Sequence, residues 1–300
     1  MAELGEALDL DADIAISTSG STGKPKEILI PASAARFSTQ SANEYLGAKP
    51  GDYWSLLLSP EHAAGINVLV RSIELGTDPV TVNEKAEFTS IVPTQLFNAL
   101  HGDAVLLSHL QGCRAVLVGG AATASELLSS AKAAGINCIT TYGMTETCGG
   151  CVYDGHPLPG VEVRINDTIE IKGPMLARVP LKDGFFVTSD TGKFQDGKLV
   201  VTGRIDDVII SGGKNLSLSK IESSLGFEYA ALGKESAKWG MALQIATSFK
   251  PNEVSDDQIQ AVLSESFGIK AEHIYRVKTI PRTTLQKVDR AALDKLLSNE

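Results

Sequence analysis

Short apolar runs and longer amphipathic segments alternate over the first half of the chain. The apolar runs are typical of strands at residues 14–16, 28–30, 53–58, 114–118 and 136–141, and the longer segments of helices at residues 65–75, 93–100 and 124–134. Pro93 suits the first turn of the second helix, and Gly135 ends the third. This alternation predicts an α/β fold with a largely parallel sheet and with ligand loops at the carboxyl ends of the strands.

The pattern changes after Gly149. Short strand-like runs separated by Gly-Pro and Asp-Gly turns occupy residues 161–210 and predict a small β-rich subdomain. From Asp207 onward we expect a compact α+β unit of roughly a hundred residues, which is a common domain size. Its last helix is predicted at residues 289–297. The sequence therefore predicts a large N-terminal domain, residues 1–205, and a small C-terminal domain, residues 206–300.

The segment Ser17 to Lys26 is rich in hydroxyl side chains and carries two glycines and two lysines. Glycines let backbone N–H groups turn toward an anion, hydroxyls donate further hydrogen bonds, and lysines add charge. A solvated linker is the alternative, but apolar runs on both sides indicate a loop held between two strands. Pro25 follows Gly23-Lys24, so the segment is not a Walker motif, and the Gly-x-Gly-x-x-Gly fingerprint is absent from the sequence.

The composition is that of an ordinary globular protein. The 300 residues allow a large core, and the formal net charge of −9 argues against a nucleic-acid-binding surface, which needs a basic patch. No apolar run approaches the length of a membrane span, and residues 1–13 lack the regions of a signal peptide. We therefore expect a cytoplasmic protein with neither nucleic acid nor membrane as partner. The sequence leaves open whether it forms a homo-oligomer.

Two of the four cysteines form the motif Cys148-Gly149-Gly150-Cys151. A redox or zinc role is one interpretation of this spacing. A zinc site would need a second pair at similar spacing, which the sequence does not contain. Free thiols are the interpretation we prefer.

Five motifs in a fixed order resemble the adenylate-forming superfamily, which contains the acyl-CoA synthetases, adenylation domains and luciferases. The first is the loop at residues 17–26. The others are Tyr142-Gly143-Met144-Thr145-Glu146-Thr147, Thr188-Ser189-Asp190, Gly203-Arg204-Ile205-Asp206-Asp207 with 211–213 and Glu222 behind it, and Pro281-Arg282-Thr283-Thr284-Leu285-Gln286-Lys287. One such motif alone is weak, whereas five in order span nearly the whole chain.

The chain departs from the family pattern at three points. Ser189 and Gln286 stand where the family usually has glycine, and typical members carry much more chain before the first loop. The departures leave the chemical groups of Asp190 and Lys287 in place. Since the motifs are all present, we expect a naturally short enzyme.

The resemblance implies a site for Mg²⁺ and ATP. Small residues at 119–121 would lie along the adenine with Tyr142 on its other face, and Asp190 would accept hydrogen bonds from the ribose. Arg204 would be its neighbour, with an ion pair to Asp206 or Asp207 as the alternative. The residues so assigned to ATP are Ser17, Thr18, Ser19, Gly20, Ser21, Thr22, Gly23, Lys24, Gly119, Gly120, Ala121, Tyr142, Gly143, Asp190 and Arg204.

The resemblance also assigns the catalytic groups. Lys287 would reach the α-phosphate, Thr145 would donate to a phosphate, and Glu146 would hold Mg²⁺, which prefers a carboxylate with phosphate oxygens and water. The alternatives are a solvated lysine and a surface glutamate. Asp206 matches the hinge about which the C-terminal domain turns between two half-reactions, although an ordinary turn aspartate fits the same position. CoA would bind at Gly212, Gly213 and Trp239.

The acyl substrate is indicated by His62 and by Arg71, nine residues later in an otherwise apolar helix. An arginine on such a face is costly to bury without a partner, and its planar fork suits a carboxylate. The pattern resembles the o-succinylbenzoate–CoA ligases of menaquinone synthesis, whose substrate carries a second carboxylate. That resemblance also places Gly143 and Thr147 at the acyl substrate. The alternative for Arg71 is an exposed residue at the helix edge.

The predicted activity is a two-step acid–CoA ligase that uses ATP, Mg²⁺ and CoA, with o-succinylbenzoate as its acid. Two alternatives remain. One is an adenylating CoA ligase for another carboxylic acid, and the other is a catalytically inactive nucleotide-binding member.

Overall fold

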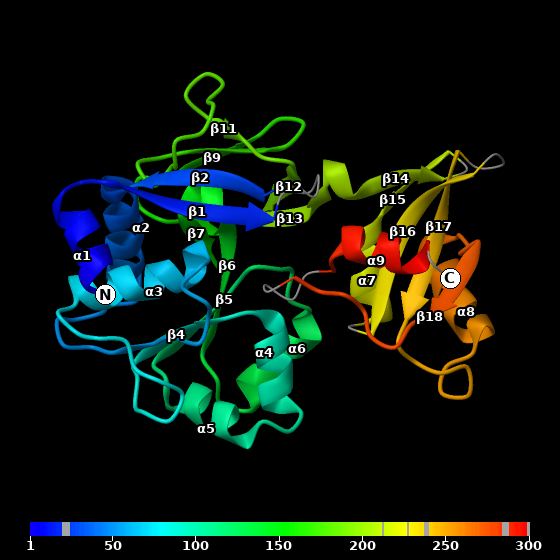
Figure 1. Ribbon diagram of the computed structural model, residues 1–300, viewed down its shortest axis with the longest axis horizontal. Coiled ribbons are helices and arrows are strands. Elements are labelled where there is room, and N and C mark those ends of the chain that lie inside the picture. Colours follow the sequence, from blue (N-terminus) through cyan, green and yellow to red (C-terminus); the bar gives the residue numbers. More distant parts are fainter. Residues whose placement is uncertain (20–24, 212, 227, 237–239, 284–287, 299–300) are drawn as a thin grey trace. The chain divides into compact units, whose positions relative to one another are not determined.

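The computed structural model describes residues 1–19, 25–211, 213–226, 228–236, 240–283 and 288–298. They form two compact units, Met1–Thr188 with Lys193–Val200, and Ser189–Gly192 with Val201–Glu300 (Figure 1). Within the described ranges, no helix has the length and apolar character that a membrane crossing needs. The functional assignment of domains 1–205 and 206–300 stays a prediction.

A six-stranded sheet forms the centre of the first unit. Its order is β3 (Trp54–Ser55), β4 (Phe88–Ile91), β5 (Ala115–Val118), β6 (Cys138–Met144), β7 (Gly149–Tyr153) and β8 (His156–Pro157). The strands β3 to β6 are parallel, and β7 and β8 continue the sheet in antiparallel fashion. The predicted α/β fold with a mainly parallel sheet is confirmed.

Helices cover both faces of this sheet, which is why β4 and β5 are buried along their whole length. Val116 and Val118 pack with α4 (Pro93–Leu100), α5 (Ala104–Gly112) and α6 (Ser125–Ala133). Ala115 and Leu117 pack in a second cluster that includes residues of α2 (Ala32–Tyr45) and α3 (Ala63–Glu74). The alternation of side chains along one strand thus gives each face its own core.

The strands β1 (Asp13–Ser19) and β2 (Pro25–Pro31) form an antiparallel hairpin beside α1 (Ala2–Asp9) and α2 (Figure 1). The pairs Ile14–Ile30 and Ile16–Ile28 belong to its register, and Ser19 faces Pro25 at the end where the two strands are connected. The expectation that the loop is held between two strands is confirmed. A three-stranded antiparallel sheet of β9 (Glu162–Ile165), β10 (Ile169–Lys172) and β11 (Phe186–Val187) follows.

The second unit is built on a five-stranded sheet. The hairpin β12 (Asp190–Gln195) and β13 (Lys198–Arg204) spans the division between the units and leads through η2 (Ile205–Asp207) into it. The sheet runs β15 (Lys214–Ser217), β14 (Val208–Ser211), β17 (Gly240–Thr247) and β16 (Tyr229–Ser236), with β18 (His273–Arg276) parallel to β17. Ala231 faces a core with α7 (Leu218–Leu225) and α8 (Asp256–Phe267), whereas Ala230 faces α9 (Arg290–Leu297).

Two predicted strands differ from the observed ones. The run 53–58 gives only Trp54–Ser55, which pairs with β4 on one side and forms a single parallel bridge to Val80 on the other. The run 136–141 becomes Cys138–Met144, because β7 pairs with its second half. The helix predicted at 93–100 has those bounds in the structure.

Candidate functional site

The segment from β6 through η1 (Thr145–Thr147) to β7 forms a tight turn. The hydroxyl of the buried Thr147 accepts a hydrogen bond from the Met144 amide and donates one to the Gly149 carbonyl, both at 2.8 Å. A Cβ on Gly143 would lie 2.0 Å from that same carbonyl oxygen, so this position admits glycine alone. The turn is thereby fixed from within, and Glu146 is presented from a rigid backbone.

The turn lies against the β1–β2 hairpin. The short helix η1 is a neighbour of β2, and the carbonyl of Glu146 accepts a hydrogen bond from the Ala177 amide at 2.9 Å. Ser17, Thr18 and Ser19 belong to β1, and the rest of the predicted phosphate loop, residues 20–24, lies outside the described residues. The structure therefore places β2, the strand that follows this loop, beside the turn that carries Glu146.

A second predicted segment follows β5 at the carboxyl edge of the sheet. Gly119 packs so closely on β6 that a Cβ there would lie 2.3 Å from the Thr141 hydroxyl, and Gly120 has a φ of +83°. Both positions therefore favour glycine. Ala121 continues this segment, and Tyr142 packs at the edge of the core cluster that includes Ile16 and Ile28. The residues predicted along the adenine thus lie beside the strand that leads into the Glu146 turn.

Arg71 lies on α3 and is 3% exposed, so the alternative of a surface arginine is wrong. Its Nη1 donates to the Ser90 hydroxyl at 3.3 Å, and its Nη2 donates to the Tyr153 hydroxyl at 3.2 Å. Its guanidinium carbon sits 4.6 Å from the centre of the Trp54 ring, and its Nε is buried without a hydrogen-bond partner. Across the described part of the chain, no acidic side chain forms an ion pair with it.

The helix α3 is tied to the Glu146 turn by Asn67, which the sequence did not single out. Its Nδ2 donates to the Cys148 carbonyl at 2.6 Å, and Cys148 has a φ of 51°. An amide among apolar residues of a helix was the signal that could have marked it. His62 is the residue before α3. In the first turn of this helix, a Cβ on Gly65 would lie 2.1 Å from the Ser59 carbonyl oxygen. The first turn of α3 therefore packs directly on the backbone at Ser59.

Asp190 and Arg204 form an ion pair in the second unit. The Nη1 of Arg204 donates to Oδ1 of Asp190 at 3.0 Å, and the carboxylate is buried. Arg204 is thus a direct neighbour of Asp190, and Asp207 pairs with Arg290. The role of Arg204 at the ribose or a phosphate stays a prediction. Gly213 has a φ of +77°. The predicted positions that lie outside the described residues are Gly20, Ser21, Thr22, Gly23, Lys24, Gly212, Trp239, Lys287 and the side chains of Thr18, Ser19 and Asp206.

The cysteines are free, as preferred from the sequence. Burial raises the pKa of Cys148 and of Cys151 to about 12, which keeps both as unreactive thiols near neutral pH. Over the part of the chain that the structure describes, no three His, Cys, Asp or Glu side chains gather so as to hold a metal ion. An ion at Glu146 would therefore take its remaining ligands from elsewhere.

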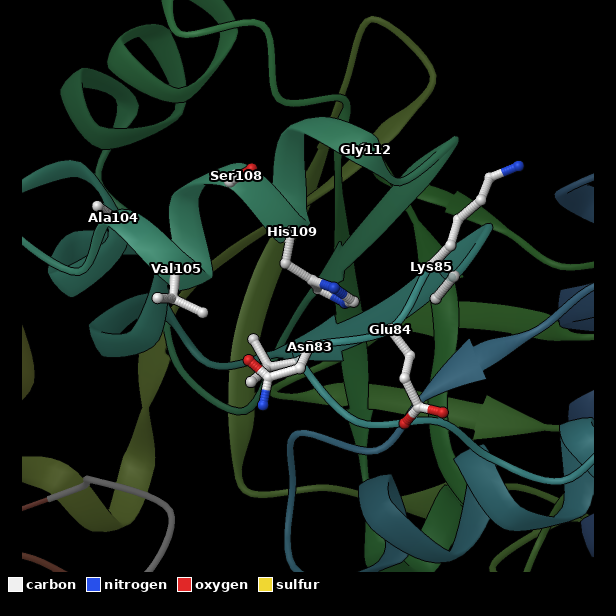
Figure 2. A pocket seen from close by; sticks show the side chains of 10 residues that line it. Asn83, Glu84, Lys85, Ala104, Val105, Ser108, His109 and Gly112 are labelled. Atoms are coloured by element: carbon white, nitrogen blue, oxygen red, sulfur yellow. The ribbon is translucent and has the colours of Figure 1, made fainter.

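A surface pocket of about 510 Å³ lies between α5 and the segment 82–86, with His109 and Asn83 among its lining residues (Figure 2). The Nε2 of His109 is 2.8 Å from the Ser55 hydroxyl, and burial lowers the pKa of this imidazole. The residues that line the pocket are different from all the predicted site residues. The histidine is accounted for by its packing against β3.

Comparisons with known proteins agree with the geometry. Residues 11–174 match the family model described as AMP-binding enzyme. The chain is 34% identical, over 99% of its length and 88% of the other, to a Mycobacterium tuberculosis protein named probable 2-succinylbenzoate–CoA ligase. It is 28% identical to the 2-succinylbenzoate–CoA ligase of Lactococcus lactis, over 93% and 70% of the two chains.

A solved structure shares the fold. The o-succinylbenzoate CoA synthetase of Bacillus subtilis, in complex with its acyl-adenylate intermediate, superposes with a TM-score of 0.80 at 26% identity, over 93% of this chain and 68% of that one.

Proposed function

Because the chain belongs to the AMP-binding enzyme family, we propose that it is an ATP-dependent ligase that joins o-succinylbenzoate to CoA. The relatives named above carry that activity in their names, and the solved neighbour holds its acyl-adenylate. One observation on this chain supports the choice of acid. Arg71 is a buried cation whose described partners are all neutral.

The reaction has two steps. In the first, an oxygen of the succinyl carboxylate attacks the α-phosphorus of ATP, the bond to the bridging oxygen breaks, and pyrophosphate leaves. Catalysis rests mainly on position and charge, which the loop from Ser17 and Lys287 would supply. Glu146 would hold Mg²⁺, with phosphate oxygens and water as the other ligands and charge neutralisation as the ion's contribution. In the second step, the CoA sulfur attacks the acyl carbon and AMP leaves, with loss of the thiol proton.

The residues of the first unit suit this chemistry. The strand β2 of the hairpin and the Glu146 turn are neighbours, so charges on the phosphates and on a bound ion would meet near them. The Gly119-Gly120 segment carries no side chains and packs closely against β6, and the adenine would lie along its backbone. In the second unit, the buried Asp190 would bind the ribose hydroxyls, and Arg204 holds its carboxylate in place.

Arg71 would bind the aromatic carboxylate, which is not activated. Its fork has five N–H groups, of which Nη1 and Nη2 each give one to a hydroxyl while Nε–H has no partner. A buried guanidinium cannot lose its proton, so its charge needs an anion nearby. A second carboxylate on the substrate would supply that anion. A fatty acid would not.

A test of the activity is the exchange of labelled pyrophosphate into ATP, with o-succinylbenzoate and 4-oxo-4-phenylbutanoate compared. The second acid is the first without its aromatic carboxylate. We expect exchange with the diacid, followed by acyl-CoA once CoA is added. An absence of exchange with every acid in a wider panel would favour the inactive nucleotide-binding member.

The role of Arg71 is tested with Arg71→Met. We expect kcat/KM for the diacid to fall about 100-fold, as for the loss of a charge-assisted hydrogen bond of about 3 kcal/mol, and the monoacid to change little. Arg114→Met is the matched control, because Arg114 also stacks on an aromatic ring, that of Phe88, but pairs with Asp52. Equal losses for the two acids would make Arg71 structural and would favour a ligase for another acid.

A further inference from the structure

One nitrogen in the second unit joins three elements that are distant in sequence. The Nη2 of Arg290, at the start of α9, lies 2.9 Å from Oδ1 of Asp207 and 3.0 Å from Oε1 of Glu222. Asp207 belongs to η2, next to the predicted hinge residue Asp206, and Glu222 belongs to α7. Both carboxylates are largely buried, with side-chain exposures of 9% and 16%.

Each carboxylate is also held by its second set of contacts. Oδ2 of Asp207 accepts from the Ser219 amide at 2.7 Å, at the first turn of α7. Oε1 of Glu222 accepts from the Ala231 amide of β16 at 2.9 Å. Because backbone amides hold both carboxyl groups in place, the guanidinium of Arg290 is itself held in one position when it binds them.

Arg290 lies directly behind the segment that carries Lys287. The two sides of that segment meet in an antiparallel bridge between Arg282 and Val288, and the Asp289 amide donates to the Pro281 carbonyl at 2.9 Å. Asp289 then caps α9 through the Ala292 amide at 2.9 Å. The base of the segment is thus continuous with the first turn of α9, where Arg290 is anchored.

We propose that Arg290 is a positioning residue of the ligase, which locks the base of the Lys287 segment to η2 and α7 through Asp207 and Glu222. The inference rests on the proposed function, because it assumes that Lys287 acts on the α-phosphate. Its consequence is that η2, which includes the predicted hinge residue, and the base of the Lys287 segment move as one body. Loss of the lock should therefore impair the step that uses Lys287 more than the step that does not.

The comparison uses the full-length chain with Arg290→Met, Arg290→Lys and the control Lys234→Met. Lys234 pairs with Asp294 and so attaches the same helix α9 to β16, but it touches neither Asp207 nor Glu222. A single nitrogen serves both carboxylates, so the ammonium of Arg290→Lys should restore part of the function. If Arg290→Met alone does not fold, Arg290→Met with Glu222→Gln, which leaves one fewer uncompensated carboxylate, takes its place.

Two readouts distinguish this proposal from the proposed function itself. The first needs no activity: hydrogen exchange of peptides covering residues 281–293 should quicken in Arg290→Met and stay unchanged in Lys234→Met. The second compares half-reactions. In pyrophosphate exchange kcat should fall about 100-fold with little change in KM, as for a reacting group displaced by about 1 Å. The reaction of preformed acyl-adenylate with CoA should lose far less.

The outcomes separate cleanly. Unchanged hydrogen exchange in Arg290→Met overturns the proposal, whatever the activity of the wild type. Equal losses in the two half-reactions also overturn it, since they indicate a general structural role. If the wild type shows no pyrophosphate exchange while the exchange of amide hydrogens responds as expected, the lock stands and the proposed function fails.

Discussion

Glu222 should make the stability of the second unit depend on pH in an unusual direction. Burial raises the pKa of its carboxyl from 4.5 to about 7, and the charge of Asp207 adds to the rise. The Arg290 charge and the Ala231 amide oppose it without cancelling it. The carboxyl therefore titrates near neutral pH although it contacts an arginine.

The sign and the size follow from linkage. Between pH 4.5 and 7 the folded protein holds a proton that the unfolded chain has released. The free energy of unfolding should therefore fall as pH rises through this window, by about 3 kcal/mol, since each pKa unit is worth about 1.4 kcal/mol. The contribution is fully present below pH 4.5 and is lost above pH 7. Glu222→Gln stays neutral at every pH, so this component should vanish in the variant.

The assay is hydrogen exchange of peptides from α7 and β16 as a function of urea, at pH values from 5 to 8 and corrected for intrinsic rates. Glu265→Gln is the control, because it makes the same chemical change at an exposed position of α8. From pH 5 to pH 8, the free energy of unfolding of the wild type should fall by about 3 kcal/mol relative to that of Glu222→Gln. A pH dependence that survives in Glu222→Gln, or that disappears equally in Glu265→Gln, would refute the reasoning.

Three further predictions concern the first unit. Gly143→Ala should destabilise it by about 3 kcal/mol in urea unfolding, because the new Cβ meets the Gly149 carbonyl; a change below about 1 kcal/mol would contradict the geometry. Native Cys148 and Cys151 should resist iodoacetamide at pH 8 and react once urea is added, because thiols with a pKa of about 12 are about one part in ten thousand thiolate there. Ligand-free Arg71→Met should unfold at an equal or higher temperature than wild type, since an uncompensated buried charge is removed; o-succinylbenzoate should raise the melting temperature of wild type alone.

The sequence predicted elements whose signals are local. Pro93 marks the start of α4, and the hydroxyl-rich loop between two apolar runs is flanked by a real hairpin. The antiparallel extension of the sheet by β7 and β8 was not predicted, because pairing of β6 with β7 depends on the turn that Thr147 closes. No periodicity in the sequence encodes such a contact.

The candidate site shows the same limit. Position and motif singled out Arg71, but its burial against Trp54 and Tyr153 joins residues up to 82 positions apart. The lock of Arg290 joins positions separated by 68 in the chain, so it too became visible only in three dimensions. The motifs pointed to residues expected to touch a ligand. Residues that hold such residues in place, as proposed for Arg290, belong to no motif that the sequence analysis used.

Charge balance distinguishes the buried Arg71 from the partly exposed Arg290. Arg290 contacts two carboxyl groups of the chain itself, so a balancing charge for it lies inside the fold. Arg71 meets two hydroxyls and an aromatic ring, which orient the guanidinium but carry no net charge. Because arginine keeps its proton even when buried, the balancing anion must come from outside the described chain. The same comparison supports both proposals, a positioning role for Arg290 and a ligand-binding role for Arg71, and a carboxylate is the ligand group whose geometry the Arg71 fork fits best.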